Sequence, residues 1–374
     1  MLTRRASLIL PLLVLPALIG CGPQRGTLPP LDPAALKVVV QQPGVPRESL
    51  ARAVDALFTD EEAQETRALL VVYAGRVVAE RYAAPYHENT RFVSWSMAKS
   101  ITGVMIGLLV ADGRLRLDES VPVPAWQRPG DSRGEITLRQ LLQMRSGLRH
   151  REEADPVYDA DTVRMLFLDG RDDMAAFAEA QPLETEAGRK FKYSSATSVI
   201  LADLAARSLT DSTDPHFRRQ AVADYLRTRL FEPVGMKSMV PEFDAAGTLI
   251  GSSLIHGTAR DWAKFGEFLR NGGAVKGAQV IPRAWIDFMT QSSPRNPGYG
   301  AQLWLNHPQV DDGQLRFPGA PQNAFAAIGH LGQYVFVSPS QKLTIVRLGK
   351  TEEAHRGTVV RRMMAVAALF PRSE

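Results

Sequence analysis

Strand patterns lie near both ends of this chain, and helix patterns fill the long segment between them. The apolar runs 68–73 and 76–82 flank Ala74-Gly75, which predicts an antiparallel hairpin. Further strand patterns at 302–306, 332–337 and 343–348 follow near the other end. Because strands must pair, we expect a single antiparallel sheet built from both ends of the chain and flanked by helices.

The middle of the chain predicts a mostly helical region, at about 114–270, inserted between sheet-forming parts at 65–113 and 275–374. This is an α/β fold class of the α+β type. The expected helices are near 48–58 and at 96–111, 137–145, 172–180, 194–208, 218–230, 258–270 and 356–369. Asp112-Gly113 and Asn271-Gly272-Gly273 provide helix-ending signals.

The N-terminus predicts export. Arg4 and Arg5 precede an apolar stretch that ends at Leu18-Ile19-Gly20-Cys21 and is too short to span a membrane comfortably. Leu-Ile-Gly-Cys resembles the bacterial lipobox, in which the cysteine is lipidated. We therefore expect a signal peptide at 1–20, a proline-rich tether at 21–46, a domain at 47–374, and an exported lipoprotein of the cell envelope anchored to the membrane through Cys21. The alternative is a plain signal peptide or membrane anchor with an incidental cysteine.

Charge gives no reason to expect a nucleic-acid partner. The chain carries 44 Lys and Arg against 40 Asp and Glu, and it has no dense basic tract. Loss of Arg4 and Arg5 with the signal peptide would reduce the excess further. Cys21 is the only cysteine, so an intramolecular disulfide and a cysteine nucleophile are both excluded.

Ser96 and Lys99 lie one helical turn apart at the start of the apolar stretch 96–111. On a helix they share a face, and Gly103 and Gly107 continue the same line, so another group can approach closely there. A buried lysine loses its proton easily because desolvation disfavours the charged form. A neutral amine can then take the proton of a serine hydroxyl and produce a nucleophile.

Ser-x-x-Lys arises by chance about once in a chain of this size, so the pattern needs companions. Here it occurs only once, directly after a predicted hairpin. Tyr193 precedes an amphipathic helix pattern and is a candidate proton relay with Lys99. Ser194 or Ser195 could instead be the N-cap of that helix, which is the commoner role for serine.

The third candidate segment is His330-Leu331-Gly332-Gln333, at the start of a predicted strand. Glycine there lets a ligand approach the backbone and leaves N–H groups available. Taken alone, His330 would be a structural histidine and Gly332 a bulge.

Together, Ser96-x-x-Lys99, Tyr193-x-Ser195 and His330-Leu331-Gly332 resemble, in order and spacing, the three motifs of the serine β-lactamase and penicillin-binding-protein superfamily. The resemblance is to the class C-like branch, which includes carboxylesterases of family VIII type and 6-aminohexanoate-dimer hydrolases. Flanking stretches at 136–148 and 258–266 fit as well, and the likeness covers about 65–370. It implies a β-lactamase/transpeptidase-like fold.

The resemblance also implies roles. Ser96 would be the acylated nucleophile, Lys99 would assist proton transfer, and Tyr193 would act as base and then as acid. The backbone N–H groups of Ser96 and Gln333 would form the oxyanion hole. Ser195, His330, Leu331 and Gly332 would bind substrate.

Two positions depart from the β-lactamase pattern. Ser195 replaces an asparagine, and His330 replaces a lysine, the fixed cation that helps to hold an acidic substrate group. Histidine is only partly charged near neutral pH. Both changes weaken the case for β-lactam antibiotics as the natural substrate and are compatible with esterases and amide hydrolases.

We therefore expect a hydrolase without metal or cofactor that cleaves an ester or amide bond of a small molecule through a Ser-Lys-Tyr acyl-enzyme. Two alternatives stay open: a β-lactamase or D,D-peptidase acting on cell-wall peptide, and a non-catalytic lipoprotein that binds the cell wall. The sequence has no G-x-S-x-G, no H-E-x-x-H and no P-loop, which argues against other hydrolase and nucleotide-binding classes.

Overall fold

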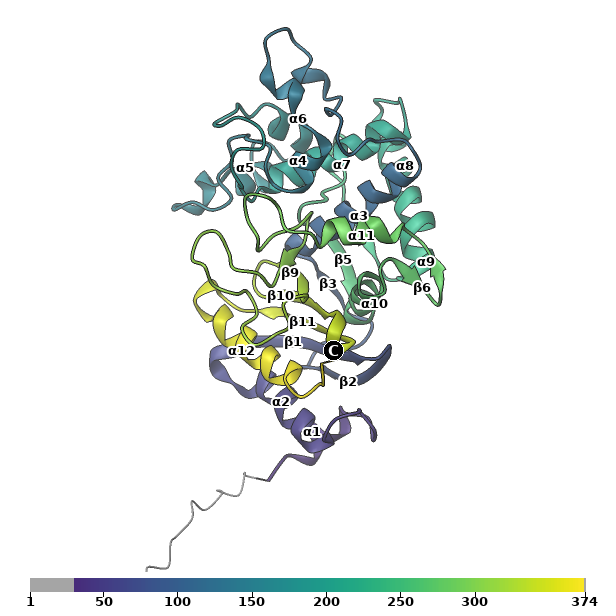
Figure 1. Cartoon of the computed structure of the whole chain (residues 1–374), viewed down its shortest axis with the longest axis vertical. Coiled ribbons are helices and arrows are strands. Elements are labelled where there is room, and N and C mark those ends of the chain that lie inside the picture. The colour runs from purple at the N-terminus through teal and green to yellow at the C-terminus, as the bar shows by residue number, and fades with distance from the viewer. Residues whose placement is uncertain (1–29, 373–374) are drawn as a thin grey trace, which may run out of the picture.

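A six-stranded antiparallel sheet lies in the lower half of the molecule in the computed structural model, which describes residues 30–372 (Figure 1). The strand order is β2-β1-β11-β10-β9-β8, so strands from the two ends of the chain pair at the centre. The strands are β1 Glu65–Tyr73, β2 Arg76–Tyr82, β8 Trp304–Leu305, β9 Phe325–Gly329, β10 Gln333–Ser338 and β11 Leu343–Lys350. The predicted sheet and its hairpin at Ala74-Gly75 are confirmed.

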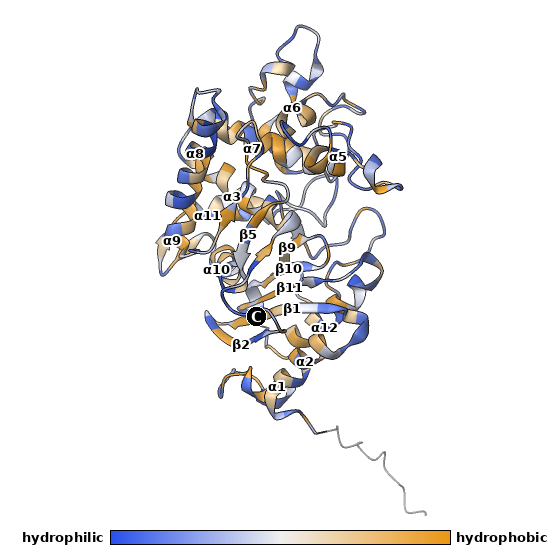
Figure 2. Cartoon of the chain, turned by 180° about the vertical axis from the view of Figure 1, so that it is seen from behind, coloured by the Kyte–Doolittle hydropathy of each residue, from blue (hydrophilic) through white to orange (hydrophobic). Residues whose placement is uncertain are grey.

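Both faces of the sheet are covered, which explains why its central strands are almost continuously apolar. Leu69 and Val71 of β1 face a core shared with α2 (Arg47–Thr59) and α12 (Arg356–Ala367). Leu70 and Val72 face the opposite core, which includes α10 (Ala259–Arg270). Figure 2 shows the apolar colouring of these strands between the helices.

The segment between the two parts of the sheet is mostly helical, as predicted. Besides α10, its helices are α3 Ala98–Ala111, α4 Leu138–Leu142, α5 Asp161–Phe167, α6 Met174–Glu179, α7 Ser195–Leu209, α8 Pro215–Leu226, α9 Glu232–Val234 and α11 Arg283–Met289. Helix α1, Pro33–Lys37, precedes the sheet. Helix α3 contacts both α7 and β9, so it joins the helical region to the sheet (Figure 1).

Several elements were missing from the sequence prediction. A small sheet of order β3-β5-β4 pairs Arg91–Val93 with Ile255–Thr258 and Val240–Pro241, and β6 Ala274–Val275 pairs with β7 Ala278–Gln279. Strand β9 was also missed, because Phe-Ala-Ala-Ile-Gly has few residues that favour strands and is held by its neighbours. Helix α10, assigned by sequence to the helical region, packs on the sheet instead.

The proline-rich segment is not extended throughout. Pro33–Lys37 forms a short helix capped by Asp32, and Arg47 binds the carbonyl oxygens of Leu36 and Val39.

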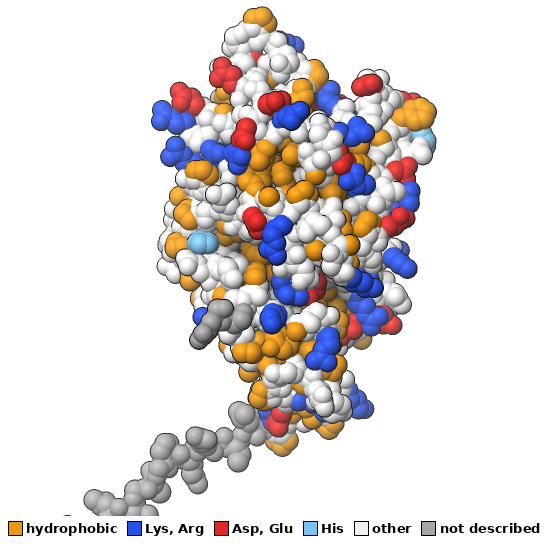
Figure 3. Space-filling model, turned by 45° about the vertical axis from the view of Figure 1, so that its right-hand side comes forward, with side chains coloured by type: hydrophobic (Ala, Val, Ile, Leu, Met, Phe, Trp, Pro, Cys, Tyr) orange, Lys and Arg blue, Asp and Glu red, His pale blue; other side chains and the backbone are white. Residues whose placement is uncertain are grey.

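Cys21 and the expected signal peptide lie outside the described residues, so lipidation and export stay predictions. Within 30–372 the longest helices fall short of the length and apolarity needed to cross a bilayer. On the face shown in Figure 3, acidic and basic side chains are interspersed.

The glycines of α3 serve packing within the protein. A Cβ at Gly107 would lie 2.2 Å from the indole nitrogen of Trp285, and one at Gly103 would lie 3.0 Å from Gln302. The same indole nitrogen donates to the carbonyl oxygen of Gly103 at 3.1 Å. The close approach expected from the glycine line is therefore made by α11 and by Gln302, and it fixes α3 in place.

We expect Gly107→Ala to lower the free energy of unfolding by about 1–3 kcal/mol, because the added methyl group would displace the Trp285 indole. Urea unfolding measures this. The matched control is Gly357→Ala in α12, where the nearest atom is 3.5 Å away. It should be neutral or stabilising by up to about 1 kcal/mol, since alanine favours helix. Equal effects of the two substitutions would contradict the packing role of Gly107.

Candidate active site

Ser96 lies in a single 3₁₀ turn, Trp95–Met97, between β3 and α3. The preceding residue, Trp95, has φ of +45°, a conformation that is costly for a bulky side chain. Ser94 fixes this turn: its hydroxyl donates to the carbonyl oxygen of Ser253 at 3.1 Å and accepts from the Ile255 N–H. The strained backbone is therefore held by hydrogen bonds to the segment that leads into β5.

Lys99 lies one turn later and is only 1% exposed. Its Nζ lies 3.0 Å from Ser96 Oγ, 2.9 Å from Ser195 Oγ and 3.0 Å from the carbonyl oxygen of Ser252. Burial lowers the pKa of Lys99 to about 8, and the charge of Glu152 acts in the opposite direction. The neutral form is therefore much more populated near physiological pH than it is for a solvated lysine, and the amine is in contact with the serine hydroxyl.

Tyr193 completes the group. Its ring stacks on Trp304 with the centroids 5.3 Å apart and lies edge-on to Tyr299 at 6.0 Å. Lys99 Nζ lies 4.9 Å from the centroid of the Tyr193 ring. Burial and the charge of Glu152 raise the pKa of Tyr193 above its ordinary value, whereas a hydrogen bond with Ser96 acts to lower it. The phenol is therefore protonated at neutral pH.

The two serines after Tyr193 have different tasks. Ser194 is the N-cap of α7, because its hydroxyl accepts the Thr197 N–H at 3.1 Å. This leaves the hydroxyl of Ser195 available, and it lies between Lys99 and Glu152. Ser195 is 1% exposed and belongs to the hydrogen-bond network around Lys99, whereas its expected role in substrate binding stays a prediction.

Glu152 is the functional candidate that the sequence analysis missed. Its Oε1 accepts the Ser195 hydroxyl at 2.6 Å, and its Oε2 accepts the Ser195 N–H at 2.7 Å. Nε2 of the buried His150 lies 2.8 Å from the same Oε2. Lys99 and these hydrogen bonds outweigh burial and hold the pKa of Glu152 at about 2. Glu152 belongs to an irregular segment with acidic neighbours, and no local pattern distinguishes it from a surface residue.

The third motif forms a tight turn between β9 and β10. Leu331 and Gly332 have φ of +59° and +77°. The buried Gln333 side chain stabilises the turn by donating to the carbonyl oxygens of His330, Leu331 and Gly349 and accepting the Gly349 N–H. Gln333 pairs with Gly329, where a Cβ would lie 2.3 Å from the carbonyl oxygen of Ser94. The predicted oxyanion residues Ser96 and Gln333 thus belong to elements in direct contact.

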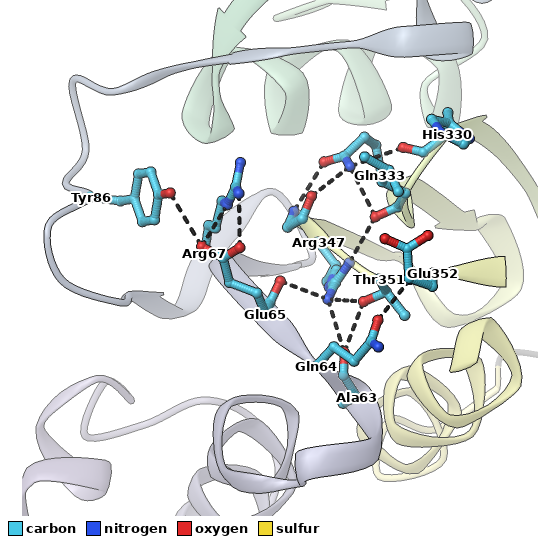
Figure 4. A network of polar contacts seen from close by, with 12 residues as sticks. Ala63, Gln64, Glu65, Arg67, Tyr86, His330, Gln333, Arg347, Thr351 and Glu352 are labelled. Carbon is cyan, nitrogen blue, oxygen red and sulfur yellow. Dashed lines mark hydrogen bonds and ion pairs between the residues drawn. The ribbon is translucent and has the colours of Figure 1, made fainter. Parts of the chain in front are cut away.

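Arg347 supports this turn from below (Figure 4). Its fully buried guanidinium donates to the carbonyl oxygen of Gly332 at 2.8 Å and to the Thr351 hydroxyl at 2.7 Å. Further acceptors are Thr66 and the carbonyl oxygens of Ala63 and Glu65. Burial lowers the pKa of Arg347 to about 10. A buried cation bonded to neutral acceptors links the first strand, the last strand and the motif turn.

His330, in the third motif, contacts the turn that carries Ser96, with its ring edge-on to Trp95 at 5.4 Å. Partial burial and the charge of Arg356 lower the pKa of His330 below its ordinary value. It is therefore mainly neutral at pH 7 and does not provide the fixed cation that a lysine would. Within residues 30–372, groups of three or more potential metal ligands are absent.

Comparison with known proteins identifies the family and the fold. The sequence profile of the family described as Beta-lactamase matches residues 54–369. A 6-aminohexanoate-dimer hydrolase from Paenarthrobacter ureafaciens is 25% identical over 325 residues, which are 82% of this chain and 80% of that protein. A penicillin-binding protein homologue from Caulobacter crescentus has a TM-score of 0.61 at 19% identity, over 88% of this chain and 98% of its own. A family VIII carboxylesterase has a TM-score of 0.62 at 18% identity, over 86% and 97%. The two solved structures share the fold.

We expect Arg347→Met to lower the free energy of unfolding by about 3 kcal/mol, because several buried acceptors would lose their donor. Loosening of the Leu331-Gly332 turn should also reduce kcat/KM about tenfold. Urea unfolding and ester hydrolysis measure the two effects. Arg116→Met, at an exposed arginine, is the control and should change neither. Stability within about 0.5 kcal/mol of wild type would show that Arg347 does not support the turn.

Proposed function

Because this chain belongs to the beta-lactamase family and is a serine hydrolase of that family, we propose that it cleaves an ester or amide bond of a small substrate through a Ser-Lys-Tyr acyl-enzyme. The observation that carries this proposal is the 3.0 Å contact between Lys99 Nζ and Ser96 Oγ at a buried amine. A solvated lysine would be charged and unable to accept a proton. Here desolvation makes the amine a usable base.

The order of the proton transfers follows from the lowered pKa of Lys99 and the raised pKa of Tyr193. Lys99 takes the Ser96 proton as Oγ forms a bond to the substrate carbonyl carbon. Tyr193, which is protonated at neutral pH, donates to the leaving alcohol or amine as the scissile bond breaks, and Lys99 returns a proton to the phenolate. Water then attacks the acyl-enzyme and releases the acid and the free serine. The backbone N–H groups of Ser96 and Gln333 would stabilise the oxyanion.

The properties of the third motif favour ester or amide hydrolysis over β-lactam cleavage. His330 is mainly neutral, so it does not provide the fixed cation that holds an acidic substrate group. The curated relative acts, by its name, on the 6-aminohexanoate dimer. We therefore place small esters and short amides ahead of β-lactams and cell-wall peptides as substrates.

We expect Ser96→Ala and Lys99→Ala each to reduce hydrolysis of p-nitrophenyl acetate by about 10³-fold or more, because one lacks the nucleophile and the other lacks its base. Labelling by a fluorophosphonate probe should disappear in Ser96→Ala. Initial rates and gel fluorescence measure these effects, with thermal unfolding to show that both variants fold.

The controls are Ser132→Ala and Lys37→Ala, which change exposed residues of the same types. Both should keep wild-type rates. Full activity or undiminished labelling in Ser96→Ala would exclude the mechanism and favour a non-catalytic binding protein.

The pH dependence follows from Lys99. Its pKa of about 8 means that the neutral, reactive form increases as the pH rises. We therefore expect kcat/KM to rise about tenfold per pH unit below pH 8 and to level off above it. Rates from about pH 6 to about pH 9.5, corrected for spontaneous hydrolysis, measure the midpoint. A flat profile, or one that falls over this range, would show that Lys99 is not the base.

A further inference from the structure

We propose that Glu152 is a positioning residue that acts through Ser195 to point the lone pair of neutral Lys99 at the Ser96 hydroxyl. The inference rests on the proposed function and extends it to a residue outside the three motifs. Glu152 lies in a different segment from Ser96, Lys99 and Tyr193, and its carboxylate is connected to Lys99 through one hydroxyl group.

The direction of each hydrogen bond follows from which groups can donate. An ionised carboxylate can only accept, so the Ser195 hydroxyl must donate to Glu152 across the 2.6 Å contact. Because its proton is used in that hydrogen bond, the Ser195 oxygen can only accept a hydrogen bond from Lys99, at 2.9 Å. If Glu152 were uncharged or absent, the Ser195 hydroxyl would be free to donate to the Lys99 nitrogen instead.

The Ser252 carbonyl oxygen is a second acceptor that cannot donate, and it lies 3.0 Å from the Lys99 nitrogen. A neutral amine has two N–H groups and one lone pair. Ser195 and Ser252 take the two N–H groups, so the lone pair remains for the third neighbour, Ser96 Oγ, at 3.0 Å. The network thus selects the one amine orientation that can accept the Ser96 proton.

Glu152 is itself held in a fixed orientation. Its Oε2 accepts the Ser195 N–H at 2.7 Å and lies 2.8 Å from His150 Nε2, which is also 3.0 Å from the Thr162 hydroxyl. Ser194 caps α7 through the Thr197 N–H, and the one helix N–H that Glu152 accepts, that of Ser195, could be taken by a neutral acceptor as well. A partly buried charge is costly to keep where a neutral acceptor would serve. Its presence beside the lysine points to a role in proton transfer.

The charge of Glu152 has a second effect, which makes the inference testable. Glu152 raises the pKa of Lys99 and opposes the effect of burial. The ionisable groups around the network are His150 beside Glu152, the Tyr193 ring beside Lys99, and Tyr299, Arg316 and Arg356 around Tyr193. Removing the Glu152 charge should therefore lower the pKa of Lys99, in addition to disturbing its orientation.

The test is the pH profile of kcat/KM for Glu152→Gln with p-nitrophenyl acetate. The glutamine amide would present an N–H to Ser195 and turn the serine hydroxyl toward Lys99. The plateau of kcat/KM at high pH should therefore fall by about tenfold to about a hundredfold. The midpoint should move to lower pH by about one unit, because a nearby negative charge is gone. Glu119→Gln, the same change at an exposed glutamate, should leave plateau and midpoint as in wild type.

Two further variants distinguish the effect of Glu152 on the orientation of Lys99 from the effect of its charge and from a loss of folding. Glu152→Asp keeps the charge but withdraws it from Ser195, so its plateau should fall while its midpoint stays near that of wild type. In a Ser195→Ala background, Glu152→Gln should cause little further loss of plateau but still shift the midpoint. Thermal unfolding of each variant accompanies the kinetics.

The role of Glu152 would be overturned by either of two results. One is a pH profile of kcat/KM whose midpoint is unchanged in Glu152→Gln. The other is a double variant, Glu152→Gln with Ser195→Ala, in which the two losses of plateau kcat/KM multiply. If Glu152→Gln does not fold, Glu152→Asp decides the matter, and wild-type kinetics in that variant would overturn the inference. Failure of the proposed function itself would be seen separately, as activity that persists in Ser96→Ala.

Discussion

The exclusion of one amine from water is the condition on which the rest of this active site depends. Lys99 comes from the first turn of α3, but the groups that surround its nitrogen come from three other places: the start of α7, the segment before β5, and, through Ser195, the loop that carries Glu152. Each supplies a polar atom and also removes water. The helical region therefore has to dock on α3 before the lysine acquires its unusual acidity.

The sheet contributes by holding the opposite side of the site. Strand β9 approaches Ser94 so closely that only glycine fits at position 329, and the following turn is bonded to Arg347 and Gln333. Arg347 is buried among neutral acceptors that come from both ends of the chain. Such a buried cation stabilises the fold only when every N–H is satisfied. Folding of the sheet and formation of the third-motif turn are therefore coupled.

Much of this could be predicted from local patterns. The apolar runs of β1, β10 and β11 predicted the sheet, and the only Ser-x-x-Lys of the chain predicted the pair Ser96 and Lys99. Other parts could not be predicted, for identifiable reasons. Strand β9 has only two strand-favouring residues, Phe325 and Ile328, and is held in place because β8 and β10 pair with it. The glycines of α3 were assigned to the site face, but the groups that approach them are Trp285 and Gln302.

The sequence by itself determined which residues are the candidates for catalysis, because a serine, a lysine and a tyrosine in this order are recognisable from type and spacing. Only the tertiary structure decided how they are charged and oriented. The contacts of Lys99 and the connection of Ser195 to Glu152 join residues 43 to 153 positions apart. The protonated state of Tyr193 likewise arises from its burial in the folded chain. Desolvation and hydrogen-bond direction depend on the complete surroundings of an atom, and those surroundings exist only after the chain has folded.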